Sequence, residues 1–257
     1  MPHPSPEPAT VELAGHRYSV EDVPGRPDRA PLLFLHEGLG SVGLWRGFHR
    51  RIAAATGRRV VAYSRLGHGW SDLPAAKRGI GFMHDEAREV VPALCAALGL
   101  GRPVFVGHSD GASIALLRAA AGGATGLVVL APHVFVEEHG LAAIRAARDA
   151  FDGGDLRARM ARHHRDPDVT FRSWNDVWLD PAFRDWDIRG VLSAITCPVL
   201  AVQGDDDPYG TLAHVEAVRD AAAGPVELLV LPGGHAPHLE HPERVDAAVV
   251  EFLAALP

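Results

Sequence analysis

The feature that most constrains this chain is a short apolar segment that ends in a serine between two glycines. Residues 103–112 read PVFVGHSDGA, and an apolar, alanine-rich run follows them. The β-branched and aromatic residues before the serine favour a strand, whereas Ile114 and Leu117 follow it at helical spacing. The segment therefore predicts a strand, a sharp turn and a helix, with Ser109 at the tip of the turn.

Gly107 and Gly111 lie two residues before and two residues after Ser109. A turn this tight brings the helix and a neighbouring strand so close that side chains at both glycine positions would collide with them. A serine held outward on such a turn is a candidate nucleophile. Because the pattern also occurs by chance, the assignment depends on partner residues elsewhere in the chain.

The rest of the chain alternates predicted strands with predicted helices. Largely apolar runs typical of buried strands occupy residues 31–35, 59–64, 127–131, 197–203 and 226–231. Segments with helical periodicity occupy residues 45–55, 83–98, 212–222 and 243–256. A short hairpin is expected around residues 11–20. The alternation predicts an α/β fold with a mostly parallel sheet covered on both faces, and functional loops at the carboxyl ends of its strands.

Residues 134–190 break this alternation. They contain three helical patches and three of the five tryptophans, and they lack a strand-like run. We interpret them as an inserted helical cap, with residues 1–133 and 191–257 forming the core. Four prolines in the first nine residues predict that residues 1–9 are a disordered leader.

Composition excludes several classes of protein. The net charge is −7 and the basic residues are scattered, which argues against a nucleic-acid partner. Cys95 and Cys197 provide neither a disulfide framework nor the spacing of a metal site. No apolar segment approaches the length of a membrane span, so we expect a soluble cytoplasmic protein without a membrane partner. The oligomeric state is not predicted.

A serine hydroxyl needs an imidazole to accept its proton and a carboxylate to orient that imidazole. The loop after the strand at 226–231 supplies His235, which directly follows two glycines. The loop after the strand at 197–203 supplies three aspartates, of which Asp207 is favoured over Asp205 and Asp206 because its side chain must reach back across the strand ends. The chain order is therefore serine, aspartate, histidine.

The spacing of His235, His238 and His241 also admits a metal cluster. Pro237 and the preceding glycines favour a loop instead of a helix face, and no acidic or cysteine ligand has matching spacing. We therefore prefer His235 as a base and predict no metal.

A tetrahedral intermediate needs backbone N–H donors for its oxyanion, and the amides of Asp110 and Gly38 are the candidates. Candidate pocket residues are His36, Glu37, Trp174 and Trp178. The two tryptophans are four residues apart and would share one helix face, although packing within the cap explains them equally well. We interpret His36, His68 and His108 mainly as structural residues near the loops.

Five motifs in this order resemble those of the α/β-hydrolase family, and the resemblance covers nearly the whole chain. They lie at residues 35–40, 63–71, 107–111, 204–207 and 233–235. The resemblance implies the α/β-hydrolase fold: an eight-stranded sheet, and a cap inserted after the sixth strand at residues 127–131. It also implies a triad of Ser109, Asp207 and His235, oxyanion donors at Gly38 and Asp110, and no cofactor.

The chain departs from the family pattern at two positions. Glu37 stands where glycine is usual after the loop histidine, and Ser64 stands where aspartate is usual. Glu37 could set a carboxylate near the pocket mouth.

The leading prediction is a serine hydrolase that cleaves a small or medium carboxylic ester through an acyl-enzyme. Three alternatives stay open: cleavage of a thioester, lactone or C–C bond by the same residues, metal-dependent hydrolysis by the three loop histidines, and a ligand-sensing protein with slow turnover.

Overall fold

The computed structural model describes residues 9–257, and its centre is one sheet of eight strands. The strands lie in the order β1-β2-β4-β3-β5-β6-β7-β8. β2 pairs antiparallel with both β1 and β4, and the other neighbours are parallel. The predicted eight-stranded, mostly parallel sheet is confirmed. The strands are β1 (Ala9–Leu13), β2 (His16–Val23), β3 (Leu32–Leu35), β4 (Val60–Tyr63), β5 (Val104–His108), β6 (Gly126–Leu130), β7 (Val199–Gly204) and β8 (Val226–Leu231).

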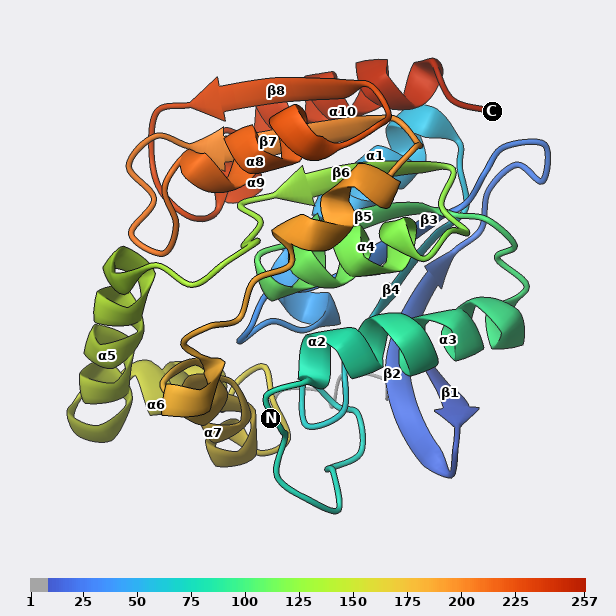
Figure 1. Cartoon of the computed structure of the whole chain (residues 1–257). Helices are drawn as coiled ribbons and strands as arrows, with labels where there is room; N and C mark the ends of the chain where they lie inside the picture. Colours follow the sequence, from blue (N-terminus) through green and yellow to red (C-terminus); the bar gives the residue numbers. More distant parts are fainter. Residues whose placement is uncertain (1–8) are drawn as a thin grey trace.

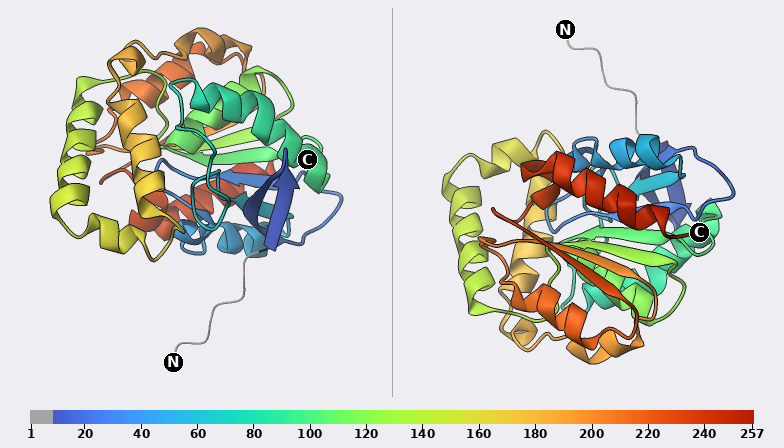
Figure 2. Two further views of the ribbon diagram at one scale, coloured as in Figure 1. Left: turned by 90° about the horizontal axis from the view of Figure 1, so that it is seen from below. Right: turned by 90° about the horizontal axis from the view of Figure 1, so that it is seen from above.

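Helices cover both faces of this sheet, as Figures 1 and 2 show. The α-helices are α1 (Phe48–Thr56), α2 (Phe82–Asp85), α3 (Val91–Leu98), α4 (Asp110–Ala120), α5 (Glu138–Gly153), α6 (Leu156–Met160), α7 (Pro167–Trp178), α8 (Ala213–Ala221), α9 (Pro237–Glu240) and α10 (Pro242–Ala254). Helices α1 and α10 lie on one face, and α3, α4 and α8 lie on the other.

The alternation of side chains along β3 explains why both faces are apolar. Leu32 and Phe34 pack into the core beneath α1 and α10, whereas Leu33 and Leu35 pack into the core beneath α3 and α4. Successive side chains of a strand point to opposite faces, so a strand buried on both sides has to be apolar throughout.

The segment between β6 and β7 forms α5, α6 and α7, which we call the inserted helices. In Figure 1 the arrowheads of β6 and β8 point toward the side where these helices lie. The inserted helices therefore face the carboxyl edge of the sheet. A bridge between Phe135 and Asp187 joins the two ends of the segment.

Three boundaries differ from the sequence predictions. The helix expected from residue 45 begins at Phe48, because Val42–Trp45 forms a 3-10 turn and Arg46 and Gly47 have left-handed φ values of 47° and 83°. The leader expected over residues 1–9 lies outside the described residues except for Ala9, which belongs to β1.

The third difference concerns the helix expected over residues 83–98. It is divided by a π turn at Glu86–Val90, directly before α3. Pro92 has no N–H group to continue the regular ladder of hydrogen bonds, and a π turn accommodates that loss.

Candidate active site

Ser109 lies at the sharp turn between β5 and α4. Its φ of 54° and ψ of −120° are strained for a residue with a side chain. The Ser109 N–H donates to Leu130 O on the neighbouring strand at 2.9 Å, and its carbonyl accepts from Ala112 N at 2.8 Å. These bonds hold the strained backbone in place at the carboxyl edge of the sheet.

The two glycines beside this turn are required by packing. A Cβ atom on Gly107 would overlap the backbone of α4 at Gly111 and Ala112. A Cβ atom on Gly111 would overlap the backbone of β3 at Leu35. Both contacts confirm the close approach that the sequence predicts for this turn.

His235 and Asp207 meet on adjacent loops that follow β8 and β7. The His235 Nδ1–H donates to Asp207 Oδ2 at 2.7 Å. Asp207 also accepts from Gln203 Nε2 at 2.7 Å and from Tyr209 N at 2.8 Å. Burial raises the pKa of the Asp207 carboxyl, but the hydrogen bond from His235 and the other polar contacts outweigh it and lower the pKa. The carboxylate therefore stays charged and holds the imidazole by Nδ1.

The loop that carries His235 is itself fastened from two sides. Glu240 accepts from Gly234 N at 2.7 Å and from Ala236 N at 3.0 Å, so it binds the residues on either side of His235. The His108 Nε2–H donates to His235 O at 2.7 Å. No periodic pattern in the sequence pointed to these contacts.

The neighbouring acids and histidines have other partners. Asp205 Oδ1 accepts from Gly233 N at 3.0 Å. His238 is buried against Trp45 and Phe48, and His241 contacts Pro232 O. Within residues 9–257, no three histidine, cysteine or acidic side chains are arranged to hold a metal ion. The loop histidines thus do not form the alternative metal cluster.

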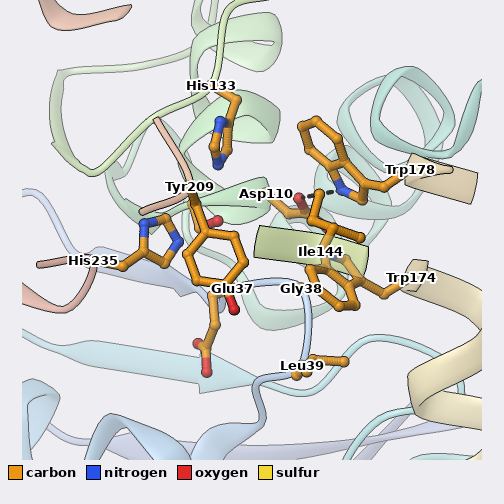
Figure 3. Close-up of a pocket in the computed structure, with 11 residues that line it drawn as sticks. Glu37, Gly38, Leu39, Asp110, His133, Ile144, Trp174, Trp178, Tyr209 and His235 are labelled. Atoms are coloured by element: carbon orange, nitrogen blue, oxygen red, sulfur yellow. Dashed lines mark hydrogen bonds between the residues drawn. The ribbon is translucent and has the colours of Figure 1, made fainter. Parts of the chain in front are cut away.

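Ser109, Asp110 and His235 line one cavity of about 100 Å³ (Figure 3). The inserted helices contribute three of its lining residues: Ile144, Trp174 and Trp178. The complete lining is Glu37, Gly38, Leu39, Ser109, Asp110, His133, Ile144, Trp174, Trp178, Tyr209 and His235. The cavity therefore brings together residues that follow five different strands and residues of two helices of the inserted segment.

His36, a predicted pocket candidate, does not line this cavity. Its ring is fully buried, and its Nε2 accepts from Arg65 N at 3.0 Å. The Arg65 guanidinium in turn donates to the carbonyls of His36 and Glu37. Hydrogen bonding within the loop, which the sequence does not reveal, turns His36 away from the cavity.

Glu37 does line the cavity, but Figure 3 shows its carboxylate pointing away from Asp110 and Trp178. Glu37 Oε2 lies 3.6 Å from His108 Nδ1. Burial raises the pKa of Glu37, but the His108 ring and other nearby groups lower it to about 2. The carboxylate that departs from the family pattern therefore faces His108.

Four lining residues were not predicted: Leu39, His133, Ile144 and Tyr209. His133 follows the end of β6, and Tyr209 lies two residues after Asp207. The sequence signal for His133 and Tyr209 is their position in loops that follow strands, since neither residue belongs to a regular pattern.

No helix among the described residues has both the length and the hydropathy needed to cross a membrane.

Comparisons with known proteins agree with this fold. A model of the alpha/beta hydrolase family matches residues 32–248. A pimeloyl-[acyl-carrier protein] methyl ester esterase from Stenotrophomonas maltophilia is 37% identical over 70 residues, a match that spans 27% of each chain.

Solved structures match over far more of the chain. A structure described as an N-acyl homoserine lactone degrading enzyme shares 26% identity with a TM-score of 0.71, covering 95% of this chain and 100% of that one. The proline iminopeptidase of Mycobacterium smegmatis shares 24% identity with a TM-score of 0.71, covering 96% and 97%. The latter likeness concerns the fold alone.

Proposed function

The chain belongs to the alpha/beta hydrolase family, and we propose that it is a serine hydrolase that cleaves small or medium carboxylic esters through an acyl-enzyme. One observation carries this proposal: Ser109 and His235 line the same cavity, and His235 is bound through Nδ1 to Asp207. That bond leaves the Nε2 of a neutral imidazole free to accept a proton.

In the proposed reaction, Ser109 Oγ attacks the ester carbonyl while His235 Nε2 takes the hydroxyl proton. The tetrahedral intermediate collapses, and the alcohol leaves with that proton. Water then attacks the acyl-enzyme and loses a proton to His235. The second intermediate releases the acid, and the proton on His235 returns to Ser109 Oγ. Asp207 orients the imidazole and stabilises its charged form.

The oxyanion donors in this scheme are the N–H groups of Asp110 and Gly38. Asp110 is the first residue of α4, so its N–H has no partner within the helix. Gly38 lines the cavity with Ser109, and a Cβ at this position would overlap the Trp174 ring. A fixed donor aimed at the developing charge is worth roughly 10²–10³-fold in rate.

The cavity favours a small bound group. Its volume of about 100 Å³ is below the several hundred Å³ typical of pockets for drug-sized ligands. We propose that residues 134–190 act as the cap over this group, since Ile144, Trp174 and Trp178 of the inserted helices line the cavity. The methyl ester esterase that is similar to 27% of this chain supports ester chemistry.

Lactone cleavage is a second candidate, because the lactone-degrading relative shares the fold over nearly the whole chain. The proposed proton transfers are the same for an open ester and a lactone. A panel of short-chain esters, thioesters and lactones compared by kcat/KM would rank these substrates.

Covalent labelling tests the nucleophile directly. We expect a fluorophosphonate to add one adduct to the wild-type protein and none to Ser109→Ala, as measured by intact mass. The variant should also lose about 10⁴-fold or more in kcat/KM for p-nitrophenyl propanoate. Ser173→Ala is the matched control, because the Ser173 hydroxyl donates to Thr170 O and lies outside the cavity lining. An adduct on Ser109→Ala would remove the proposal.

A further inference from the structure

The Asp110 side chain is fully buried, and one of its two carboxyl oxygens lacks a hydrogen-bond donor within the part of the chain that the structure describes. Its exposed fraction is 0%. Oδ1 accepts from Trp178 Nε1 at 3.1 Å, the bond dashed in Figure 3. Oδ2 is buried and has no hydrogen-bond donor among residues 9–257. One carboxyl oxygen is thus satisfied by the inserted helices, and the other has no donor among the described residues, while Asp110 itself lines the cavity.

A buried polar atom without a partner destabilises the fold, and more so when the group is charged. An unsatisfied buried atom of this kind requires an explanation, and one explanation is a ligand or a reaction that uses it. Burial raises the pKa of Asp110 above its ordinary value, and the positive charges of Arg65 and Arg78 oppose this effect only in part. A cationic donor at Oδ2 would lower the pKa, because an opposite charge favours the ionised form.

The other walls of the cavity also suit a cation. None of its eleven lining residues is a lysine or an arginine. Trp174, Trp178 and Tyr209 present aromatic rings, which attract cations through their negative faces. Burial and neighbouring charges hold the pKa of His133 well below its ordinary value, so this ring stays neutral.

We propose that the free Asp110 carboxylate oxygen binds an ammonium group of the substrate, so that the preferred substrates are amino-acid esters with a free α-amino group. This inference rests on the proposed function. Asp110 directly follows Ser109, and both residues line the same cavity. An ammonium bound by Asp110 therefore shares this cavity with the carbonyl that Ser109 attacks, and an α-amino ester carries both groups on neighbouring carbons.

A matched pair of esters tests this specificity. Benzyl L-alaninate and benzyl propanoate differ at the α-carbon by the amino group alone. We expect wild-type protein to prefer the alaninate, and the ratio of the two kcat/KM values to fall about 100-fold in Asp110→Asn. Asparagine keeps a carbonyl oxygen for Trp178 Nε1 but replaces the free acceptor with an N–H₂ donor.

Asp176→Asn is the matched control, because Asp176 lies on the same inserted helix as Trp178, pairs with Arg148 and does not line the cavity. It makes the same change of charge, and its ratio should equal that of the wild type. A ratio in Asp110→Asn equal to the wild-type ratio would overturn the inference.

Binding without turnover gives an independent answer. In Ser109→Ala protein, we expect calorimetry to show at least tenfold tighter binding of L-alaninamide than of propanamide. Equal affinities would overturn the inference even if Asp110→Asn failed to fold.

The two proposals fail in different ways. Turnover of benzyl propanoate that depends on Ser109, without preference for the amino compounds, removes only the ammonium site. Preferential binding of L-alaninamide without turnover of either ester supports the ammonium site and removes the esterase.

Discussion

The interior of the sheet and the loops at its carboxyl edge both contain buried side chains, yet different forces hold them. In β3 and β4 every side chain is at most 1% exposed, and the only polar side-chain group is the Tyr63 hydroxyl, which donates to Glu86. At the edge, the buried side chains include Arg65, Asp110 and Asp207, each with polar atoms that need partners. Apolar burial is non-directional, whereas hydrogen bonds fix orientation. The contrast explains why one region provides stability and the other holds reactive groups in position.

The largest expected effect is at Asp207, where a substitution should lower kcat strongly and change stability little. In Asp207→Asn, an N–H₂ group can face His235 Nδ1 and favour the wrong tautomer, so we expect kcat for p-nitrophenyl propanoate to fall about 10⁴-fold. The unfolding midpoint in urea should change little. Asp205→Asn is the control, because Asp205 accepts from Gly233 N instead of contacting His235. Equal losses in the two variants would contradict the assignment of Asp207.

The opposite result is expected in the interior at Phe34. Its ring is fully buried, with ring centroids 5.0 Å from Trp45 and 5.7 Å from Phe48. Phe34→Ala should lower the free energy of unfolding by about 3–5 kcal/mol because it leaves a cavity. Urea unfolding measures this loss, and titration with the fluorophosphonate allows kcat per folded molecule to be compared. A variant of normal stability but much lower kcat would show that the interior also tunes the reaction.

The same contrast explains which parts could be predicted from the sequence. Apolar runs predicted the buried strands to within two residues, because a strand buried on both faces has to be apolar. The turn at Ser109 and the positions of Asp207 and His235 after strands were also readable. Whether these residues perform the proposed catalysis stays a prediction that the experiments above address.

The rest depended on contacts between distant residues. His36 was a pocket candidate, but its bond to Arg65 N places it elsewhere. Glu240 accepts hydrogen bonds from the backbone on both sides of His235, at Gly234 and at Ala236. No sequence motif indicates these contacts. Helix α1 begins at Phe48 and not at residue 45, because two left-handed residues follow a 3-10 turn. Directional bonds and backbone conformations of this kind leave no periodic signal.

Glu137 joins the two regions, because it directly precedes α5 where the chain leaves the core. Its carboxylate accepts from Thr211 N at 2.9 Å and Thr211 Oγ1 at 2.8 Å, and it lies 2.9 Å from His214 Nε2. The contact with His214 and the bonds from Thr211 outweigh burial and lower the pKa of Glu137 from 4.5 to about 2. The ionised carboxylate thus fastens the inserted helices to the loop that carries Asp207.

The smallest expected effect is therefore a pH-dependent one at Glu137. Because the pKa is lower in the folded state, the stabilisation is present above about pH 4.5 and is lost as the pH falls toward about 2. Solvent reaches this site and screens the charge, so we expect Glu137→Gln to lower the free energy of unfolding at pH 7 by about 1 kcal/mol. The difference from wild type should shrink steadily as urea unfolding is repeated between pH 5 and 2.5.

Glu138→Gln provides the comparison at the next position. Glu138 is exposed and pairs with Arg145 and Arg184 on the surface, away from the loop that carries Asp207. Its substitution should change stability less than that of Glu137. A difference between wild type and Glu137→Gln that stays constant down to pH 2.5 would mean that the Glu137 charge does not stabilise the junction, and that the inserted helices are held to the edge by apolar packing alone.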